Sequence, residues 1–169
     1  MTEKLVEWFV VNLGGKLTKE VVVFIISLFP ILELRGGLLA AGPAFLDVPV
    51  NVAMPLCIIG NLLPIPFILL LICPIFDWMR GTKYFRPLVE KLENKAMSKK
   101  DRIEKYEFWG LLFFVGIPLP GTGAWTGSLI AALLGMDKKK TFGAVVCGVL
   151  LASVIMYLIS YVFIGGIFG

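Results

Sequence analysis

Two charged side chains stand inside the apolar part of this chain. Glu33 and Arg35 belong to the sequence Glu-Leu-Arg-Gly-Gly, and long apolar stretches flank them on both sides. A charged group at the centre of a membrane helix costs roughly 2.5 to 3.5 kcal/mol, so both residues need a compensating partner. A guanidinium binds phosphate or carboxylate through two parallel hydrogen bonds, which makes Arg35 a candidate for binding an anionic headgroup. Removal from water disfavours the charged form of a carboxyl, which makes Glu33 a candidate proton-coupling residue.

A structural interpretation of the same pair stays open. At positions i and i+2 the two side chains point to different faces of a helix, so they do not pair along one face. We therefore expect at least one of them to reach across to another segment or to a ligand. In the structural interpretation, both side chains only cap and brace breaks in the backbone.

A second candidate segment is residues 118–127, which read Pro-Leu-Pro-Gly-Thr-Gly-Ala-Trp-Thr-Gly. The segment lies within an uncharged run from Phe108 to Met136, which is longer than the roughly 20 residues of a straight span. Its prolines remove backbone donors, and its glycines let the chain turn. In hydrocarbon the freed backbone groups must be satisfied by protein or water, so we expect this break to line a site. A proline kink in an ordinary spanning helix is the simpler alternative.

Hydroxyl groups and one aromatic ring accompany this break. Thr122, Thr126 and Ser128 offer hydrogen bonds, while Trp125 offers a flat amphipathic surface. A threonine before a helical run is also an ordinary N-cap, so a half-helix over residues 127–136 would direct its positive end at an anion. The predicted substrate-binding residues are Glu33, Arg35, Gly36, Gly37, Pro118, Pro120, Gly121, Thr122, Gly123, Trp125, Thr126, Gly127 and Ser128.

The composition excludes several other kinds of chemistry. The chain has no histidine, which rules out Ser-His-Asp and Cys-His catalysis and histidine-based metal sites. Cys57, Cys73 and Cys147 lie in apolar runs without zinc-like spacing, so we interpret them as buried small hydrophobes and not as disulfides or ligands. We therefore expect no enzyme activity, no catalytic residue, no metal and no cofactor.

The bulk composition is that of an integral membrane protein. Of the 169 residues, 58% are hydrophobic and only 17% are charged, which is outside the range of soluble domains. The net charge is +4, but the basic residues stand in short segments between apolar runs. This is the positive-inside pattern, so we expect no nucleic-acid partner. We expect a multi-pass protein of the cell's inner, or cytoplasmic, membrane with membrane lipids around it.

The apolar runs and their breaks divide one predicted membrane domain, residues 1–169, into four parts. These are an interfacial helix (1–19), a first repeat (20–76), a basic cytoplasmic connector with an amphipathic helix (77–107) and a second repeat (108–169). Each repeat holds a broken segment followed by a span. In the first repeat we expect Pro64 and Pro66 to kink the span.

A shift of about 90 residues relates the two repeats. Pro30 then aligns with Pro120, and Gly37 aligns with Gly127. A weak sequence match with a shared layout is typical of the internal repeats of transporters. Two topologies compete: re-entrant hairpins would make the halves inverted, whereas kinked spans would make them parallel.

Charge counting does not separate these topologies, because each puts twelve basic residues inside and three outside. We favour hairpins, since they shelter the irregular backbone within protein. The predicted fold is thus all-α integral membrane, with two inverted repeats that each hold a re-entrant helical hairpin and a spanning helix.

Both breaks resemble a known family. Glu-Leu-Arg-Gly-Gly at 33–37, the segment 118–127 and Leu-Leu-Gly-Met at 133–136 are similar to the family labelled small multidrug export proteins. That family is in turn similar in layout to the DedA superfamily of membrane proteins with paired re-entrant hairpins. Some DedA proteins are implicated in translocating polyprenyl phosphate lipids. The resemblance therefore implies the same kind of substrate as an expectation for this chain.

Together these features predict a membrane transporter or translocase. Its expected substrate is amphipathic, anionic and lipid-like, of the polyprenyl-phosphate type, with proton coupling through Glu33. A proton-coupled exporter of lipophilic drugs is one alternative, and a non-transporting membrane scaffold is another. Small residues at Gly143, Gly148 and Ala152 leave a homo-oligomer open.

Overall fold

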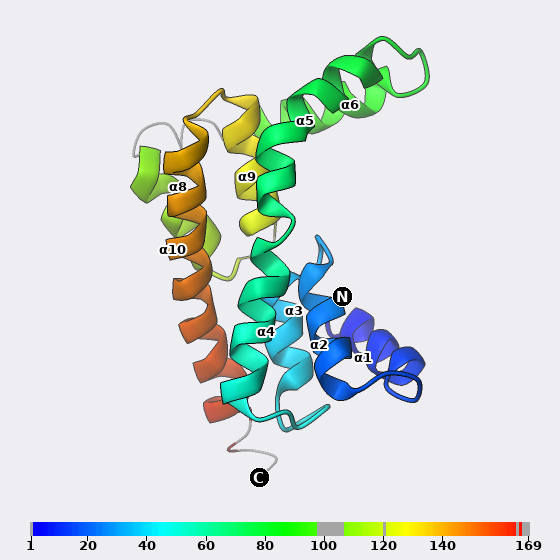
Figure 1. The fold of residues 1–169 in the computed structure, drawn as a ribbon, viewed down its shortest axis with the longest axis vertical. Coiled ribbons are helices and arrows are strands. Elements are labelled where there is room, and N and C mark those ends of the chain that lie inside the picture. Colours follow the sequence, from blue (N-terminus) through cyan, green and yellow to red (C-terminus); the bar gives the residue numbers. More distant parts are fainter. Residues whose placement is uncertain (1, 98–106, 120, 165, 167–169) are drawn as a thin grey trace.

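The chain folds into helices, and no strand occurs among the residues that the structure describes (Figure 1). The computed structural model describes residues 2–97, 107–119, 121–164 and 166. The helices are α1 (Thr2–Leu13), α2 (Lys19–Leu28), α3 (Glu33–Ala41), α4 (Val50–Leu62), α5 (Ile65–Arg80), α6 (Arg86–Met97), α8 (Glu107–Gly116), α9 (Ala124–Leu133), α10 (Lys138–Tyr157) and the π-helical η1 (Leu158–Phe163). The all-α prediction is confirmed for these residues.

Two long helices cross most of the molecule. Residues 50–80 and 138–163 are each long and apolar enough to span a membrane. The first is divided into α4 and α5 at Leu63 and Pro64, next to the position predicted for a kink, while Pro66 lies in the first turn of α5. Much of its apolar surface is exposed, including Phe67 and Leu71, as expected for side chains that face lipid. Together with the composition, these helices indicate a membrane protein.

The α2–α3 pair forms a helical hairpin whose turn contains Pro30. The turn covers residues 29–32, and α3 begins at Glu33. Gly36 and Gly37, which we expected within the break, are therefore helical. The reason is packing: a Cβ on Gly37 would overlap the Ser27 hydroxyl of α2 and contact the Cys57 sulfur of α4. Two glycines let three helices approach closely, and this gain outweighs their low helix propensity.

The α8–α9 pair forms a second hairpin around the other break. Its turn ends at Gly123, so Trp125, Thr126 and Gly127 belong to α9. The predicted half-helix from Gly127 thus begins too late by three residues, and its N-cap is Gly123 instead of a threonine. The physical reason is that another segment of the chain caps this helix, as described below.

The two hairpins come from opposite ends of the molecule, and their turns face each other at mid-height (Figure 1). The α4–α5 helices run from the end that holds α2–α3 to the end that holds α8–α9, and α10 runs back. The basic helix α6 and the start of α10 lie at the same end. The hairpin turns therefore meet near the centre of the fold.

The peripheral segments agree with the prediction in part. Helix α1 covers Thr2–Leu13, within the segment 1–19 predicted as an interfacial helix, with Trp8 exposed and Val6 buried. Within the connector, α6 carries a buried Val89 on one face, and Arg80 pairs with Glu93. The rest of the connector, residues 98–106, lies outside the described residues.

The interpretation of the cysteines needs a correction. All three are free, but only Cys57 is buried, whereas Cys73 and Cys147 are exposed. An apolar run in a membrane protein faces lipid as well as protein, so an apolar position does not imply burial among side chains.

Candidate functional site

Glu33 binds the start of α9. It is 5% exposed, and its two carboxylate oxygens accept hydrogen bonds from Ala124 N (3.0 Å) and Trp125 N (3.1 Å). The first N–H groups of a helix have no partner within the helix and carry a partial positive charge. A carboxylate is therefore the matching group for this helix end. Glu33 itself has a φ of 50°, a left-handed conformation that costs roughly 1–2 kcal/mol for a residue with a Cβ.

Gly123 makes this contact sterically feasible. As the N-cap of α9 it has no side chain to bind the helix end, and its φ of 141° is unfavourable for other residues. A Cβ at this position would overlap the Glu33 carboxylate. The glycine therefore supplies both the turn and the space for a cap that comes from 90 residues earlier in the chain.

Arg35 binds the end of α8 and the turn after it. Its Nη1 donates to the carbonyl of Leu119 (2.8 Å), and its Nη2 donates to the carbonyls of Ile117 (3.1 Å) and Val115 (3.3 Å). The last carbonyls of a helix lack intrahelical partners and carry a partial negative charge, so a cation is favourable here. The planar guanidinium reaches several oxygens at once, which the ammonium of a lysine does less well.

Thr122 completes the contacts around the guanidinium. Its Oγ1 accepts a hydrogen bond from Arg35 Nη2 at 3.0 Å. The single hydrogen of this hydroxyl is within reach of two carbonyl acceptors, Leu119 at 2.8 Å and Ile117 at 3.0 Å. The hydroxyl therefore binds the cation and tightens the turn that holds the other acceptors.

Both charged residues thus reach across to the other hairpin, which confirms that expectation. Glu33 binds the positive end of one half-helix and Arg35 binds the negative end of the other. This arrangement is the one that the structural interpretation of the pair describes. A ligand that binds Arg35 has to compete with oxygens of the protein already bound to it.

The remaining predicted residues have different surroundings. Trp125 joins the junction through its backbone, whereas Gly36, Gly37, Gly127 and Ser128 are buried in helix packing. Pro118 and Gly121 lie in the turn before α9, where Gly121 has a φ of 76°, and Thr126 is half-buried in α9. Pro120 lies outside the described residues. The structure therefore brings Glu33, Arg35, Thr122, Gly123 and Trp125 together.

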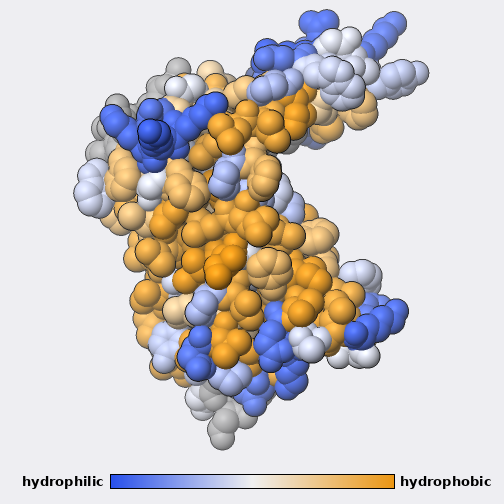
Figure 2. Space-filling view, in the orientation of Figure 1, coloured by the Kyte–Doolittle hydropathy of each residue, from blue (hydrophilic) through white to orange (hydrophobic). Residues whose placement is uncertain are grey.

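An apolar groove, which we did not predict, lies beside this junction. It has a volume of about 500 Å³, and Figure 2 shows an apolar hollow between the α5–α6 arm and the α2–α3 hairpin. Trp125 is part of its wall, and the indole Nε1 is buried without a partner among the described residues. Further lining residues include Phe29, Leu63, Phe67, Leu71 and Ile75. In the sequence, this groove corresponds to the breaks at Pro30 and Pro64, both of which line it.

Within the described ranges, no group of three or more His, Cys, Asp or Glu side chains is placed to hold a metal ion.

Comparison with known proteins gives one match. A model of the family described as "Putative small multi-drug export protein" matches residues 33–155. The matched range begins at Glu33. It includes the residues through which the two hairpins contact each other, helices α4 and α5, and most of α10. Searches of curated proteins and of solved structures gave no match. The expected likeness to the DedA superfamily has no support from these comparisons, whereas the chain belongs to the small multi-drug export protein family.

Proposed function

We propose that this protein is a multi-pass exporter of lipophilic compounds in the cytoplasmic membrane. The observation that carries the proposal is the apolar groove next to the Glu33–α9 contact. Sites for small molecules are concave and mostly apolar, with a few polar groups that converge on them. The family's description points to the same class of function.

The topology that we propose consists of re-entrant hairpins in two inverted repeats. Three observations support it. The order hairpin then long helix occurs twice, as α2–α3 with α4–α5 and as α8–α9 with α10. Glu33 and Gly123, which the repeat aligns, are in contact at the junction. Finally, α6 and the start of α10 lie at one end, as hairpins require and kinked spans do not (Figure 1).

The cargo that we propose is lipophilic and not defined by an anionic headgroup. The groove offers apolar and aromatic side chains along α4–α5 and at Trp125. The expected polyprenyl-phosphate-like substrate has less support, because Arg35 already donates to three carbonyls and to Thr122. Neither cargo requires a metal, a cofactor, a nucleic-acid partner or enzyme activity.

Glu33 couples cargo movement to a proton in this proposal. Protonation neutralises the carboxylate and weakens its two hydrogen bonds with the N–H groups of Ala124 and Trp125. Trp125 is also part of the groove wall. Release of the α9 end therefore alters the groove and lets the two hairpins move relative to each other.

Reconstituted vesicles with an imposed pH gradient test the proposal, with ethidium as the lipophilic probe. We expect Glu33→Gln to remove gradient-driven ethidium transport, because the amide keeps an acceptor but exchanges no proton. Trp125→Ala should lower transport about tenfold or more, whereas Trp109→Ala, on the exposed face of α8, should leave it within about twofold. If folded Glu33→Gln and Trp125→Ala proteins transport like the parent, the coupling role of Glu33 and the groove as cargo site are wrong. If the parent itself shows no gradient-driven ethidium transport, the scaffold alternative gains and the exporter proposal fails.

A further inference from the structure

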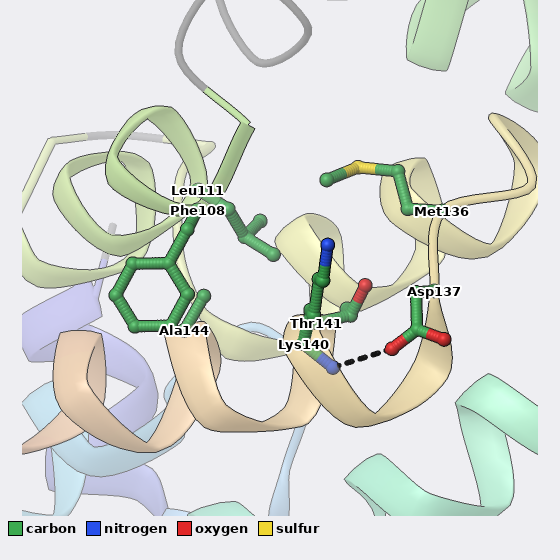
Figure 3. A pocket seen from close by; sticks show the side chains of 7 residues that line it. All are labelled: Phe108, Leu111, Met136, Asp137, Lys140, Thr141 and Ala144. Atoms are coloured by element: carbon green, nitrogen blue, oxygen red, sulfur yellow. Dashed lines mark hydrogen bonds between the residues drawn. The ribbon is translucent and has the colours of Figure 1, made fainter.

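A second cavity lies at the opposite end of α8 from the hairpin junction. It has a volume of about 480 Å³ and lies between the start of α8 and the start of α10. Figure 3 shows Lys140 and Thr141 pointing from α10 toward the space between Leu111 and Met136. Phe108 and Ala144 complete an apolar wall. The cavity thus has a polar side on α10 and an apolar side on α8.

Thr141 is the unusual residue of this cavity. It is 1% exposed, and its Oγ1 has no hydrogen-bond partner among the residues that the structure describes. A buried hydroxyl without a partner costs roughly 1–3 kcal/mol. Because the Thr141 side chain lines a cavity large enough for a ligand, an acceptor atom bound there would remove this penalty.

The charge around Thr141 indicates an anionic acceptor. Lys138, Lys139 and Lys140 form the first turn of α10, a helix of 20 residues whose N-terminal end is positive. Among the described residues that line the cavity, Asp137 is the acid, and its Oδ1 accepts a hydrogen bond from Lys140 N at 2.8 Å. Lys140 lines the cavity, whereas Lys138 and Lys139 line a neighbouring groove. Three lysines and one aspartate leave this end of α10 positive, and the Lys140 ammonium is the cation on the cavity side.

We propose that this cavity binds the phosphate headgroup of an anionic lipid. The phosphate accepts from Thr141 Oγ1 and from the Lys140 ammonium, and the first part of an acyl chain lies on Leu111, Phe108 and Met136. Because α10 is long and apolar enough to span the membrane, its N-terminus lies at the depth of lipid headgroups. Basic pockets between helices at this depth are suited to anionic lipids. The site is separate from the groove proposed for cargo.

Thermal unfolding of the purified protein in non-ionic detergent tests the proposal. The probes are a short-chain phosphatidylglycerol, the matching phosphatidylcholine and inorganic phosphate. Phosphatidylglycerol should raise the unfolding temperature in a saturable manner, and the other two should not. Stabilisation by inorganic phosphate at the same concentrations would overturn the lipid as the source of the headgroup.

Three variants separate a site from general attraction to basic residues. Thr141→Val and Lys140→Gln should each weaken the apparent affinity for phosphatidylglycerol about tenfold. Lys139→Gln removes the same charge, but Lys139 lines a different groove with Pro66 and Phe142, so its effect should stay within about twofold. Equal losses in Lys139→Gln and Lys140→Gln, or an unchanged affinity in Thr141→Val, would overturn the proposal.

The stability of the lipid-free protein gives an independent reading. Removing an unpartnered hydroxyl should leave lipid-free Thr141→Val at least as stable as the parent. If Thr141→Val fails to fold, Thr141→Ser should bind like the parent and Lys140→Gln decides the outcome. A Thr141→Val protein that is less stable without lipid would mean that the hydroxyl already has a partner, which contradicts the site.

Discussion

The two hairpins share a layout but bring opposite kinds of group to their junction. The α2–α3 hairpin supplies charged side chains, Glu33 and Arg35, whereas the α8–α9 hairpin supplies backbone N–H and carbonyl groups. A carboxylate meets the positive end of α9, and a guanidinium meets the carbonyls after α8. The two hairpins are thus complementary where they meet.

This division explains why the second hairpin needs no charge of its own. Its turn leaves backbone groups without partners within their own helix, and hydrocarbon offers them no hydrogen bonds. Side chains of the first hairpin supply these hydrogen bonds instead. A charge pair inside the membrane is tolerable here because each charge has several fixed hydrogen-bond partners. Substituting one partner at a time therefore tests how much each contact stabilises the junction.

The largest effect should come from Glu33→Ala. The substitution leaves two N–H groups of α9 without an acceptor and removes the negative charge from the helix end. We expect the free energy of unfolding in detergent to fall by about 3–4 kcal/mol. Glu33→Gln keeps one acceptor oxygen and should lose about half as much. Equal stability of Glu33→Ala and the parent would show that water or detergent replaces the cap.

A slightly smaller loss should follow Gly123→Ala. The new Cβ would overlap the Glu33 carboxylate, and a φ of 141° is unfavourable for alanine. We expect a loss of about 2–3 kcal/mol in chemical unfolding. Gly135→Ala is the matched control, since Gly135 also has a positive φ (68°) but no atom within 4 Å of an added Cβ. Its loss should be about 1 kcal/mol, and a larger loss than for Gly123→Ala would contradict the steric argument.

Arg35→Lys examines the other half of the junction. Lysine keeps the positive charge near the α8 carbonyls but cannot reach Leu119, Ile117 and Thr122 together. We expect a loss of about 1–2 kcal/mol, measured by thermal unfolding. Arg35→Gln, which removes the charge, should lose more. If both variants are equally stable, the charge contributes little and the geometry of the donors dominates.

The smallest effect should come from Thr122→Val. This variant keeps the shape of the side chain but removes an acceptor for Arg35 and a donor for the turn carbonyls. The expected loss is about 1 kcal/mol. Thr126→Val, in the first turn of α9, should lose less than half of that. In double-mutant cycles, Thr122→Val should couple to Arg35→Lys and not to Glu33→Gln.

Sequence reasoning identified the breaks, the charged pair and the special position of Pro64, but it misplaced helix ends within the breaks. Gly36 and Gly37 were expected to interrupt a helix, yet they lie inside α3. Gly127 was expected to start a half-helix, yet α9 starts at Ala124. In both cases local propensity was outweighed by contacts with distant residues, namely Ser27 for Gly37 and Glu33 for α9.

What the sequence by itself determined is the class of protein and the places where regular helix is impossible. Long uncharged runs require a nonpolar solvent, and prolines interrupt hydrogen bonding wherever they stand. Only the tertiary structure decided the partners of Glu33 and Arg35, because those partners, apart from the Thr122 hydroxyl, are backbone groups of Val115, Ile117, Leu119, Ala124 and Trp125. Every residue has such groups, so no side-chain pattern marks them in advance. Their role depends on where two hairpins from distant parts of the chain meet.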